Sequence, residues 1–130
     1  MKNLLVVLAL GLLLGIANSC YYDITLEKLD EPADPNAPEV SFANDILPIF
    51  NRSCNSSGCH NTGGTAPDLS ASKAYNALTT GNYINTTSPE NSELYQWLKG
   101  ARRLPMPLSG SDQAINTAVL TWIRQGAKNN

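Results

Sequence analysis

The 130-residue sequence predicts a small all-α domain of about four short helices at positions 41–130, preceded by an N-terminal leader. Apolar residues recur at helical spacing in several segments, and no segment makes a convincing strand. Serines and prolines stand where these segments begin, and glycines stand where they end. Without its leader the chain is long enough for one small domain and no more.

Residues 1–19 have the features of a secretory signal peptide. Lys2 supplies a short positive region, and an uncharged apolar run follows from Leu4 to Ile16. Small residues then lead to Cys20, as at a cleavage site. The run is too short and wrongly flanked for a membrane-spanning helix, so we expect export.

The residues around the predicted cleavage point resemble a bacterial lipobox, Ala17-Asn18-Ser19-Cys20, whose Cys becomes the lipidated first residue of the mature protein. We therefore expect a lipid on Cys20 that anchors the protein to a bacterial membrane. Tyr21 rather than an Asp follows, which favours the outer membrane, with the domain in the periplasm or at the cell surface. The alternative is ordinary cleavage that leaves Cys20 as an odd thiol.

The segment from 20 to 40 is expected to be a disordered tether. Positions 21–40 hold six acids against Lys28 alone, a net charge of −5, with three prolines spaced three apart. Such a segment cannot bury enough apolar area to offset its ordering entropy, and it would reach about 60 Å when extended. In the alternative, three residues near its start pack onto the domain: Tyr21, Tyr22 and Ile24.

The domain at 41–130 carries seven cations against five anions, a net charge of +2. Binding of nucleic acid requires a dense basic stripe, and these charges form none. Five acids are interpreted as cap, turn and solvated-face residues rather than catalytic pairs. They are Asp45, Asp68, Glu90, Glu93 and Asp112.

The first predicted helix runs from Ser41 to about Asn51. The Ser41 hydroxyl can accept a hydrogen bond from an unpaired N–H of the first turn. Pro48 lacks the N–H that a helical bond would need, so we expect a short or kinked helix. Its apolar stripe consists of Phe42, Ile46, Ile49 and Phe50.

Two further helices are predicted in the middle of the domain. One begins at Ser70 or Ser72 and continues through Leu78, and Gly81 ends it. The next begins at Ser88-Pro89-Glu90 and runs to about Lys99, where Gly100 stops it. The residues expected to face inward are Tyr75 and Leu78 in the first, and Leu94, Trp97 and Leu98 in the second.

The last predicted helix begins at Ser111 and ends before Gly126. It has the clearest amphipathic pattern in the chain, which predicts one buried face. That face consists of Ile115, Val119, Trp122 and Ile123.

The segment Cys54-Asn55-Ser56-Ser57-Gly58-Cys59-His60 holds the protein's only histidine and two of its three cysteines. A covalently held haem would use all three, because each thiol adds to one porphyrin vinyl group and the imidazole binds the iron. The usual spacing is C-x-x-C-H, whereas four residues separate the cysteines here. Gly58 could supply the flexibility that the longer arc requires.

Other uses of these residues remain open. A Cys54–Cys59 disulfide is sterically possible and common outside the cell. A zinc site would need a fourth ligand beyond two Cys and one His, and only Cys20 is available. Two free thiols in an oxidising compartment are the third alternative.

Met106 is the candidate for a second axial ligand of the iron. It is the only methionine of the mature chain and lies between Pro105 and Pro107, which stiffen its loop. Its thioether is a soft ligand that c-type cytochromes use to raise the reduction potential. The alternative for a lone methionine is a filler of the core.

Residues 41–127 resemble a small monohaem c-type cytochrome domain of a bacterial lipoprotein, in the variant with four residues between the haem cysteines. The matching segments are Phe42–Phe50, Cys54–His60, Met106-Pro107 and Trp122-Ile123. The resemblance implies short helices wrapped around one haem, with the first and last helices crossing near its edge.

The same resemblance implies the roles of four residues. Cys54 and Cys59 would be the thioether positions, His60 the proximal ligand and Met106 the distal ligand of the haem iron. It also implies that a backbone carbonyl in the loop after the histidine, near Pro67, orients the imidazole.

The function expected from these features is single-electron transfer to and from redox partner proteins at a membrane, rather than conversion of a substrate by an enzyme. Arg102 and Arg103 are either solvated loop charges or partners of the haem propionates. A haem peroxidase or a gas-binding or redox sensor is one alternative, in which Met106 is off the iron. A non-haem, disulfide-stapled binding lipoprotein is the other.

Overall fold

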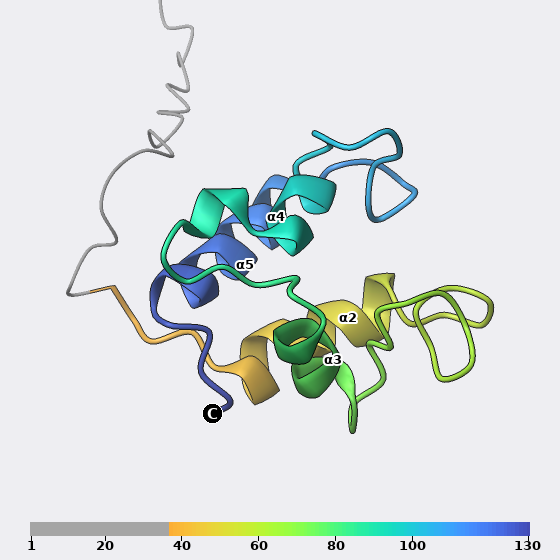
Figure 1. The fold of residues 1–130 in the computed structure, drawn as a ribbon, viewed down its shortest axis with the longest axis horizontal. Coiled ribbons are helices and arrows are strands. Elements are labelled where there is room, and N and C mark those ends of the chain that lie inside the picture. The colour runs from red at the N-terminus through yellow and green to blue at the C-terminus, as the bar shows by residue number, and fades with distance from the viewer. Residues whose placement is uncertain (1–36) are drawn as a thin grey trace, which may run out of the picture. The chain divides into compact units, whose positions relative to one another are not determined.

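The computed structural model describes residues 37–130, which belong to one compact unit (Figure 1). This part of the chain is helical and has no strand, so the all-α prediction is confirmed for it. Its elements are the π-helical turn η2 (Phe42–Ile46), α2 (Leu47–Ser53), α3 (Ala74–Thr80), the 3-10 turn η3 (Pro89–Asn91), α4 (Glu93–Leu98) and α5 (Gln113–Arg124). The predicted signal peptide, the lipid on Cys20 and most of the tether lie outside the described residues. Within 37–130, none of the helices has the length and apolar character needed to span a membrane.

The first helix begins where predicted but with a wider turn. The Ser41 hydroxyl accepts a hydrogen bond from the Asn44 N–H at 3.1 Å, and the Ser41 N–H donates to the Asp45 carboxylate at 2.8 Å. In a regular α-helix the Asn44 carbonyl would accept a hydrogen bond from the N–H of residue 48. Residue 48 is a proline, which has no N–H, so this bond cannot form. The π-helical turn η2 accommodates this gap, and α2 then continues to Ser53, past the predicted end.

The second helix starts later than Ser70 or Ser72. Asp68 accepts hydrogen bonds from the Ser70 N–H at 3.0 Å and from the Ser70 hydroxyl at 2.6 Å. These bonds form a turn, which competes with helix formation at this position. The helix α3 therefore begins at Ala74, and it ends at Gly81 as predicted.

The third helix is broken, contrary to the prediction of one helix from Ser88 to Lys99. Ser92 has extended backbone angles between η3 and α4, and its side chain is fully buried. Its hydroxyl accepts the Asn85 N–H at 2.9 Å and lies 3.3 Å from the Asn85 carbonyl oxygen. This contact with a residue seven positions earlier holds Ser92 outside a helical conformation. Gly100 ends α4 with a φ of 77°.

The last helix, α5, is capped by Asp112 rather than by Ser111. The Asp112 carboxylate accepts the N–H groups of Ala114 at 2.8 Å and Ile115 at 3.1 Å. All four residues of the predicted apolar face are buried. The helix packs against η2 and α4 and thus forms the centre of the core.

The expected contact between the first and last helices is present at η2. The Phe42 ring centroid lies 5.3 Å from that of Trp122 and 5.3 Å from that of Tyr75. The Trp122 indole N–H donates to the Lys128 carbonyl at 2.9 Å. These aromatic contacts join η2, α3 and α5 into one core.

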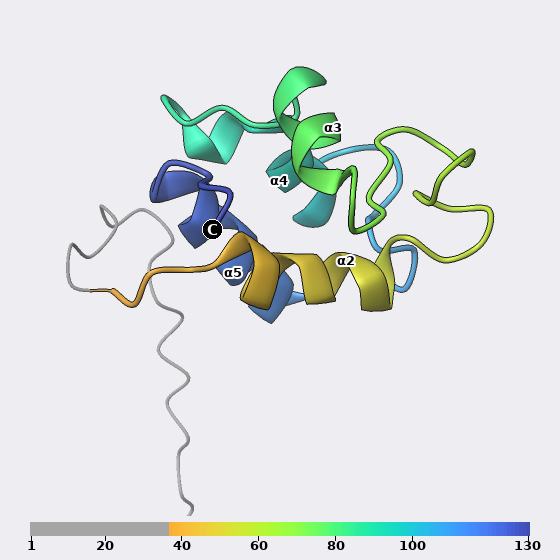
Figure 2. The same cartoon turned by 90° about the horizontal axis from the view of Figure 1, so that it is seen from below.

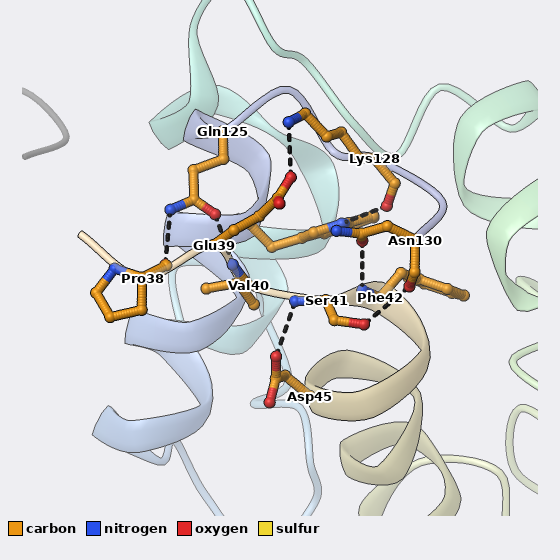
Figure 3. A network of polar contacts seen from close by, with 10 residues as sticks. Pro38, Glu39, Val40, Ser41, Phe42, Asp45, Gln125, Lys128 and Asn130 are labelled. Atoms are coloured by element: carbon orange, nitrogen blue, oxygen red, sulfur yellow. Dashed lines mark hydrogen bonds and ion pairs between the residues drawn. The ribbon is translucent and has the colours of Figure 1, made fainter. Parts of the chain in front are cut away.

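Residues 38–40, which were assigned to the tether, bind the end of α5 (Figure 3). The Val40 N–H donates to the Gln125 side-chain oxygen at 2.8 Å, and the Gln125 amide donates to the Pro38 carbonyl at 3.1 Å. Lys128 forms an ion pair with Glu39 at 2.6 Å. Within residues 37–130, contacts with the domain therefore extend to Pro38, ahead of the predicted boundary at Ser41.

Asn130 completes this set of contacts at the start of η2 (Figure 3). Its side-chain oxygen accepts the Phe42 N–H at 2.9 Å, and its carbonyl accepts the Ser41 hydroxyl at 2.8 Å and the Ala43 N–H at 2.9 Å. We call the contacts of residues 38–43 with residues 125–130 the terminal contacts. Figures 1 and 2 show them at one end of the domain and the loops after α2 and α4 at the other.

Candidate functional site

The loop from Cys54 to Leu69 is closed by its own backbone. The His60 N–H donates to the Cys54 carbonyl at 3.1 Å, and the Thr65 N–H donates to the Cys59 carbonyl at 2.8 Å. Further along, the Leu69 N–H donates to the His60 carbonyl at 2.7 Å. We call this segment the proximal loop, and these bonds fix the relative positions of its two thiols and its imidazole.

Close packing within the proximal loop requires a glycine at position 64. A Cβ atom there would lie 2.2 Å from the Cys59 carbonyl oxygen and 2.6 Å from the Asn61 side-chain oxygen. Neither distance is tolerable, so Gly64 permits the turn that brings Thr65 back to Cys59. Gly58, which was expected to add flexibility between the cysteines, has a φ of 79°. Glycine adopts this left-handed conformation readily.

The imidazole of His60 is oriented by the Thr65 carbonyl, whose oxygen lies 3.1 Å from Nδ1. A carbonyl can only accept, so Nδ1 carries the proton and donates it. In the neutral imidazole with this proton, Nε2 is the nitrogen that can bind a metal. A carbonyl of this kind was expected near Pro67, and the structure corrects its position to Thr65.

The thiols of Cys54 and Cys59 are half-buried, and both are free in the structure rather than joined as a disulfide. Burial raises the pKa of the Cys54 thiol to about 11, and the nearby Cys59 thiol adds to the rise. Reactive cysteines have lowered pKa values, because the thiolate is the nucleophile. Cys54 is therefore unlike a catalytic cysteine.

Met106 lies in the irregular segment between α4 and α5. Residues 100–110 form this segment, which we call the distal loop. The Met106 N–H donates to the Trp97 carbonyl at 3.3 Å, and the Ala101 N–H donates to the Gln96 carbonyl at 3.0 Å. Met106 itself is half-buried.

A single cavity of about 510 Å³ brings the four predicted site residues together. Cys54, Cys59 and His60 line it from the proximal loop, and Met106 lines it from the distal loop. Between them the wall is largely apolar and aromatic, with Phe50, Leu69, Tyr83, Leu94, Trp97 and Leu98 among its residues. Pockets of about 300–1,000 Å³ with apolar walls and few polar groups are typical of small-molecule and cofactor sites.

The contact between η2 and α5 does not form part of this wall. Phe42 and Trp122 belong to the packed core, and Phe50 of α2 belongs to the same core and also lines the cavity. The first helix is thus part of the core along its length and reaches the site at Phe50.

Glu93 is a cavity residue that the sequence did not reveal, since it was interpreted only as a cap, turn or solvated-face acid. Its carboxylate lines the cavity and accepts the Trp97 indole N–H at 2.8 Å. It also forms an ion pair with Arg102. No ion pair of Arg103 is found within residues 37–130, so the two adjacent arginines differ.

The other acids have structural contacts. Asp68 forms the turn before α3 and Asp112 caps α5, as interpreted. Asp45 binds the Ser41 N–H, and Glu90 forms an ion pair with Arg124 at 2.6 Å. Hydrogen bonds from the Arg124 side chain keep the pKa of Glu90 below its usual value.

The cavity residues fit a covalently attached haem. Two free thiols and an imidazole come from the proximal loop, a thioether comes from the distal loop, and most of the other lining residues are apolar. Within residues 37–130, no three His, Cys, Asp or Glu side chains are grouped so as to hold a bare metal ion. A haem makes no such demand, because its porphyrin supplies four of the iron's ligands and the protein supplies only the axial ones.

Comparison with protein-family models, with curated proteins and with solved structures gave no match.

Proposed function

We propose that this protein is a membrane-tethered single-electron carrier with one covalently attached c-type haem. The observation that carries the proposal is the shared cavity of Cys54, Cys59, His60 and Met106. His60 is the protein's only histidine and Met106 its only methionine besides Met1, and the four residues come from two loops with α3 and α4 between them in the sequence. Core packing alone gives no reason for them to meet.

Each of the four residues has a distinct role in this proposal. Cys54 and Cys59 would hold the porphyrin through thioether bonds, and His60 would bind the iron while the Thr65 carbonyl orients its imidazole. Met106 would supply a thioether sulfur as the second ligand. When bound, the haem provides reversible one-electron exchange at its iron.

The remaining wall residues govern the environment of that exchange. The apolar side chains of α4, with Phe50 and Leu69, make the wall of the cavity largely apolar. Low polarity and a thioether ligand both favour a higher reduction potential. If His60 and Met106 both held the iron, no position on it would be left for a substrate, and the protein would be a carrier rather than a peroxidase or a gas sensor.

The expected lipid on Cys20 and the acidic tether complete the proposal. Together they would confine the domain to a bacterial membrane, where it exchanges electrons with redox partner proteins. Because the tether is long compared with the domain, the cavity mouth could reach partners in several orientations.

The direct test is the mass and visible spectrum of the full-length protein, produced in a host with haem-attachment machinery. The denatured protein should retain the mass of one haem and show the spectrum of a reduced c-type cytochrome. A matched variant, Cys54→Ser with Cys59→Ser, should lose both while remaining exported. A colourless wild-type protein containing a Cys54–Cys59 disulfide would overturn the proposal in favour of a disulfide-stapled lipoprotein.

A further inference from the structure

The distal loop that carries Met106 projects from the domain. It includes the two large apolar residues that are most exposed within the described chain, Leu104 at 54% and Leu108 at 69%. Its hydrogen bond from Met106 to Trp97 is long, at 3.3 Å. A loop with so little buried surface depends on specific polar contacts to stay in one position.

Glu93 supplies such contacts with both of its carboxylate oxygens. Oε1 accepts the indole N–H of Trp97, four residues later on the same face of α4, at 2.8 Å. Oε2 pairs with the guanidinium group of Arg102, which belongs to the distal loop. One carboxylate thus fixes a helix side chain and a loop side chain at the same time.

Trp97 connects this pair to Met106. Its indole is held by Glu93, and its backbone carbonyl accepts the Met106 N–H. The distal loop is attached to α4 at its start by backbone bonds from Gly100 and Ala101. Its middle is attached at two further positions, through the side chain of Arg102 and through the backbone of Met106. Arg102 is attached to Glu93 and Met106 is attached to Trp97, and these two residues of α4 lie one helical turn apart.

We propose that Glu93, Trp97 and Arg102 form a latch that holds the distal loop over the cavity and so positions Met106. These are positioning residues, which act on the iron only through Met106. The inference rests on the proposed function, in which Met106 is an axial ligand. In that setting the latch determines how often Met106 leaves the sixth position, and thereby how open the iron is to outside ligands.

The latch also gives Arg102 a role different from the two considered from the sequence. Its guanidinium faces a protein carboxylate at the cavity wall, with 43% of the Arg102 side chain exposed and 36% of the Glu93 side chain exposed. Arg103, the next residue, has no such pairing within residues 37–130 and serves as a matched control.

Two opposite substitutions separate a latch from a simple effect of charge. Glu93→Gln removes a negative charge beside the cavity, and Arg102→Gln removes a positive one. A charge effect alone would shift the reduction potential in opposite directions and leave the loop unchanged. A latch predicts that both variants loosen the loop to a similar extent, and that the double variant is no looser than either single one.

The test is hydrogen exchange, followed by mass spectrometry, of the full-length exported protein. Exchange in the peptide that contains Met106 should become about two- to fivefold faster in both single variants, as expected for loss of a partly exposed ion pair. Arg103→Gln should leave it unchanged. Carbon monoxide should also bind more readily to the reduced forms of the two latch variants. Unchanged exchange in both latch variants, or equal acceleration in Arg103→Gln, would overturn the inference.

The same mass spectra separate a failure of this inference from a failure of the proposed function. The peptide containing Cys54 and Cys59 carries the added mass of haem if the proposed function is right. If the added mass of haem is absent, haem attachment is refuted, whatever the hydrogen exchange of the distal loop. If the added mass is present and exchange in the distal loop is unchanged, the latch alone is refuted.

Discussion

The two loops that line the cavity are built in different ways. The proximal loop is closed by backbone hydrogen bonds of 2.7–3.1 Å, and a glycine at its most crowded point leaves no room for a side chain. The distal loop has short backbone bonds only near its two ends, from Gly100, Ala101 and Gly110. Its middle is attached through the side chain of Arg102 and one backbone bond of 3.3 Å from Met106. One loop is rigid because of its own backbone, whereas the other depends on its neighbour, α4.

This difference suits the roles that we propose for the two loops. Two thioether bonds and an oriented imidazole require fixed positions for Cys54, Cys59 and His60. A distal ligand tolerates more variation, since its distance and occupancy adjust the potential without releasing the cofactor. Three substitutions test whether the loops differ as described.

The largest effect is expected from Gly64→Ala in the proximal loop. The new methyl group would clash with the Cys59 carbonyl oxygen at 2.2 Å, and a backbone atom cannot move aside cheaply. We expect a loss of about 3 kcal/mol in the free energy of unfolding. Denaturant unfolding measures the stability, and the haem content shows whether the thiols are still presented correctly.

Gly63→Ala is the matched control for that clash. Gly63 has a φ of 82°, but a Cβ atom there would meet nothing within 4 Å. Its substitution should cost only the strain of a left-handed residue, about 1 kcal/mol. Equal losses in the two variants would show that crowding at Gly64 does not determine the loop.

Met106→Ala should have an intermediate effect, on ligation rather than on attachment. Because haem attachment depends on the proximal loop, the variant should keep its haem while its potential falls. Its reduced form should bind carbon monoxide, whereas the wild type should bind it poorly. Leu104→Ala, an exposed residue of the same loop, is the control and should behave like the wild type. Ready binding of the gas by the wild type would contradict axial ligation by Met106.

The smallest effect is expected from Asp68→Asn, at the end of the proximal loop. The Ser70 hydroxyl, which donates a hydrogen bond to Asp68, lowers the pKa of that carboxyl from 3.8 to about 2. A folded-state pKa below the unfolded value stabilises the fold at neutral pH, and this contribution is lost as the pH falls through about 2. The variant should therefore be less stable than the wild type at pH 7, and the difference should shrink below pH 3.8.

Thermal unfolding between pH 2 and pH 7 measures this difference. Ser70→Ala removes the main cause of the lowered pKa and should reproduce much of the effect. A difference between wild type and Asp68→Asn that stays constant with pH would exclude a contribution from ionisation of Asp68.

The sequence was most informative where local pattern and burial coincide. The four residues predicted for the apolar face of α5 are all buried, because helical spacing indicates which side packs inward. Leu120, which was not predicted, is buried as well. The break at Ser92 was missed, since its hydroxyl is bound by Asn85 in an irregular segment with no periodicity. The turn at Ser70 was missed for a similar reason, because the same side chain serves equally well as a helix cap or as a turn partner.

In the candidate site, the residues that could be identified from the sequence are of types that have few other roles in a small protein domain. Cys54, Cys59, His60 and Met106 are chemically distinctive, and the structure brings all four to one cavity. The Thr65 carbonyl could not be identified in this way, because every residue has a backbone carbonyl and only the turn at Gly64 selects this one. Glu93 was missed because a glutamate in the first turn of a helix is already explained by the helix dipole.

The terminal contacts also determine how the domain bears mechanical load. Pro38 and Val40 are bound to Gln125, and Phe42 to Asn130, at the end of the domain away from the two loops (Figures 1 and 3). A pull on the chain ahead of Pro38 is therefore borne first by the end of α5 and the first turn of η2. The cavity lies away from these contacts. We therefore expect the terminal contacts to break before a pulling force disturbs the proximal and distal loops.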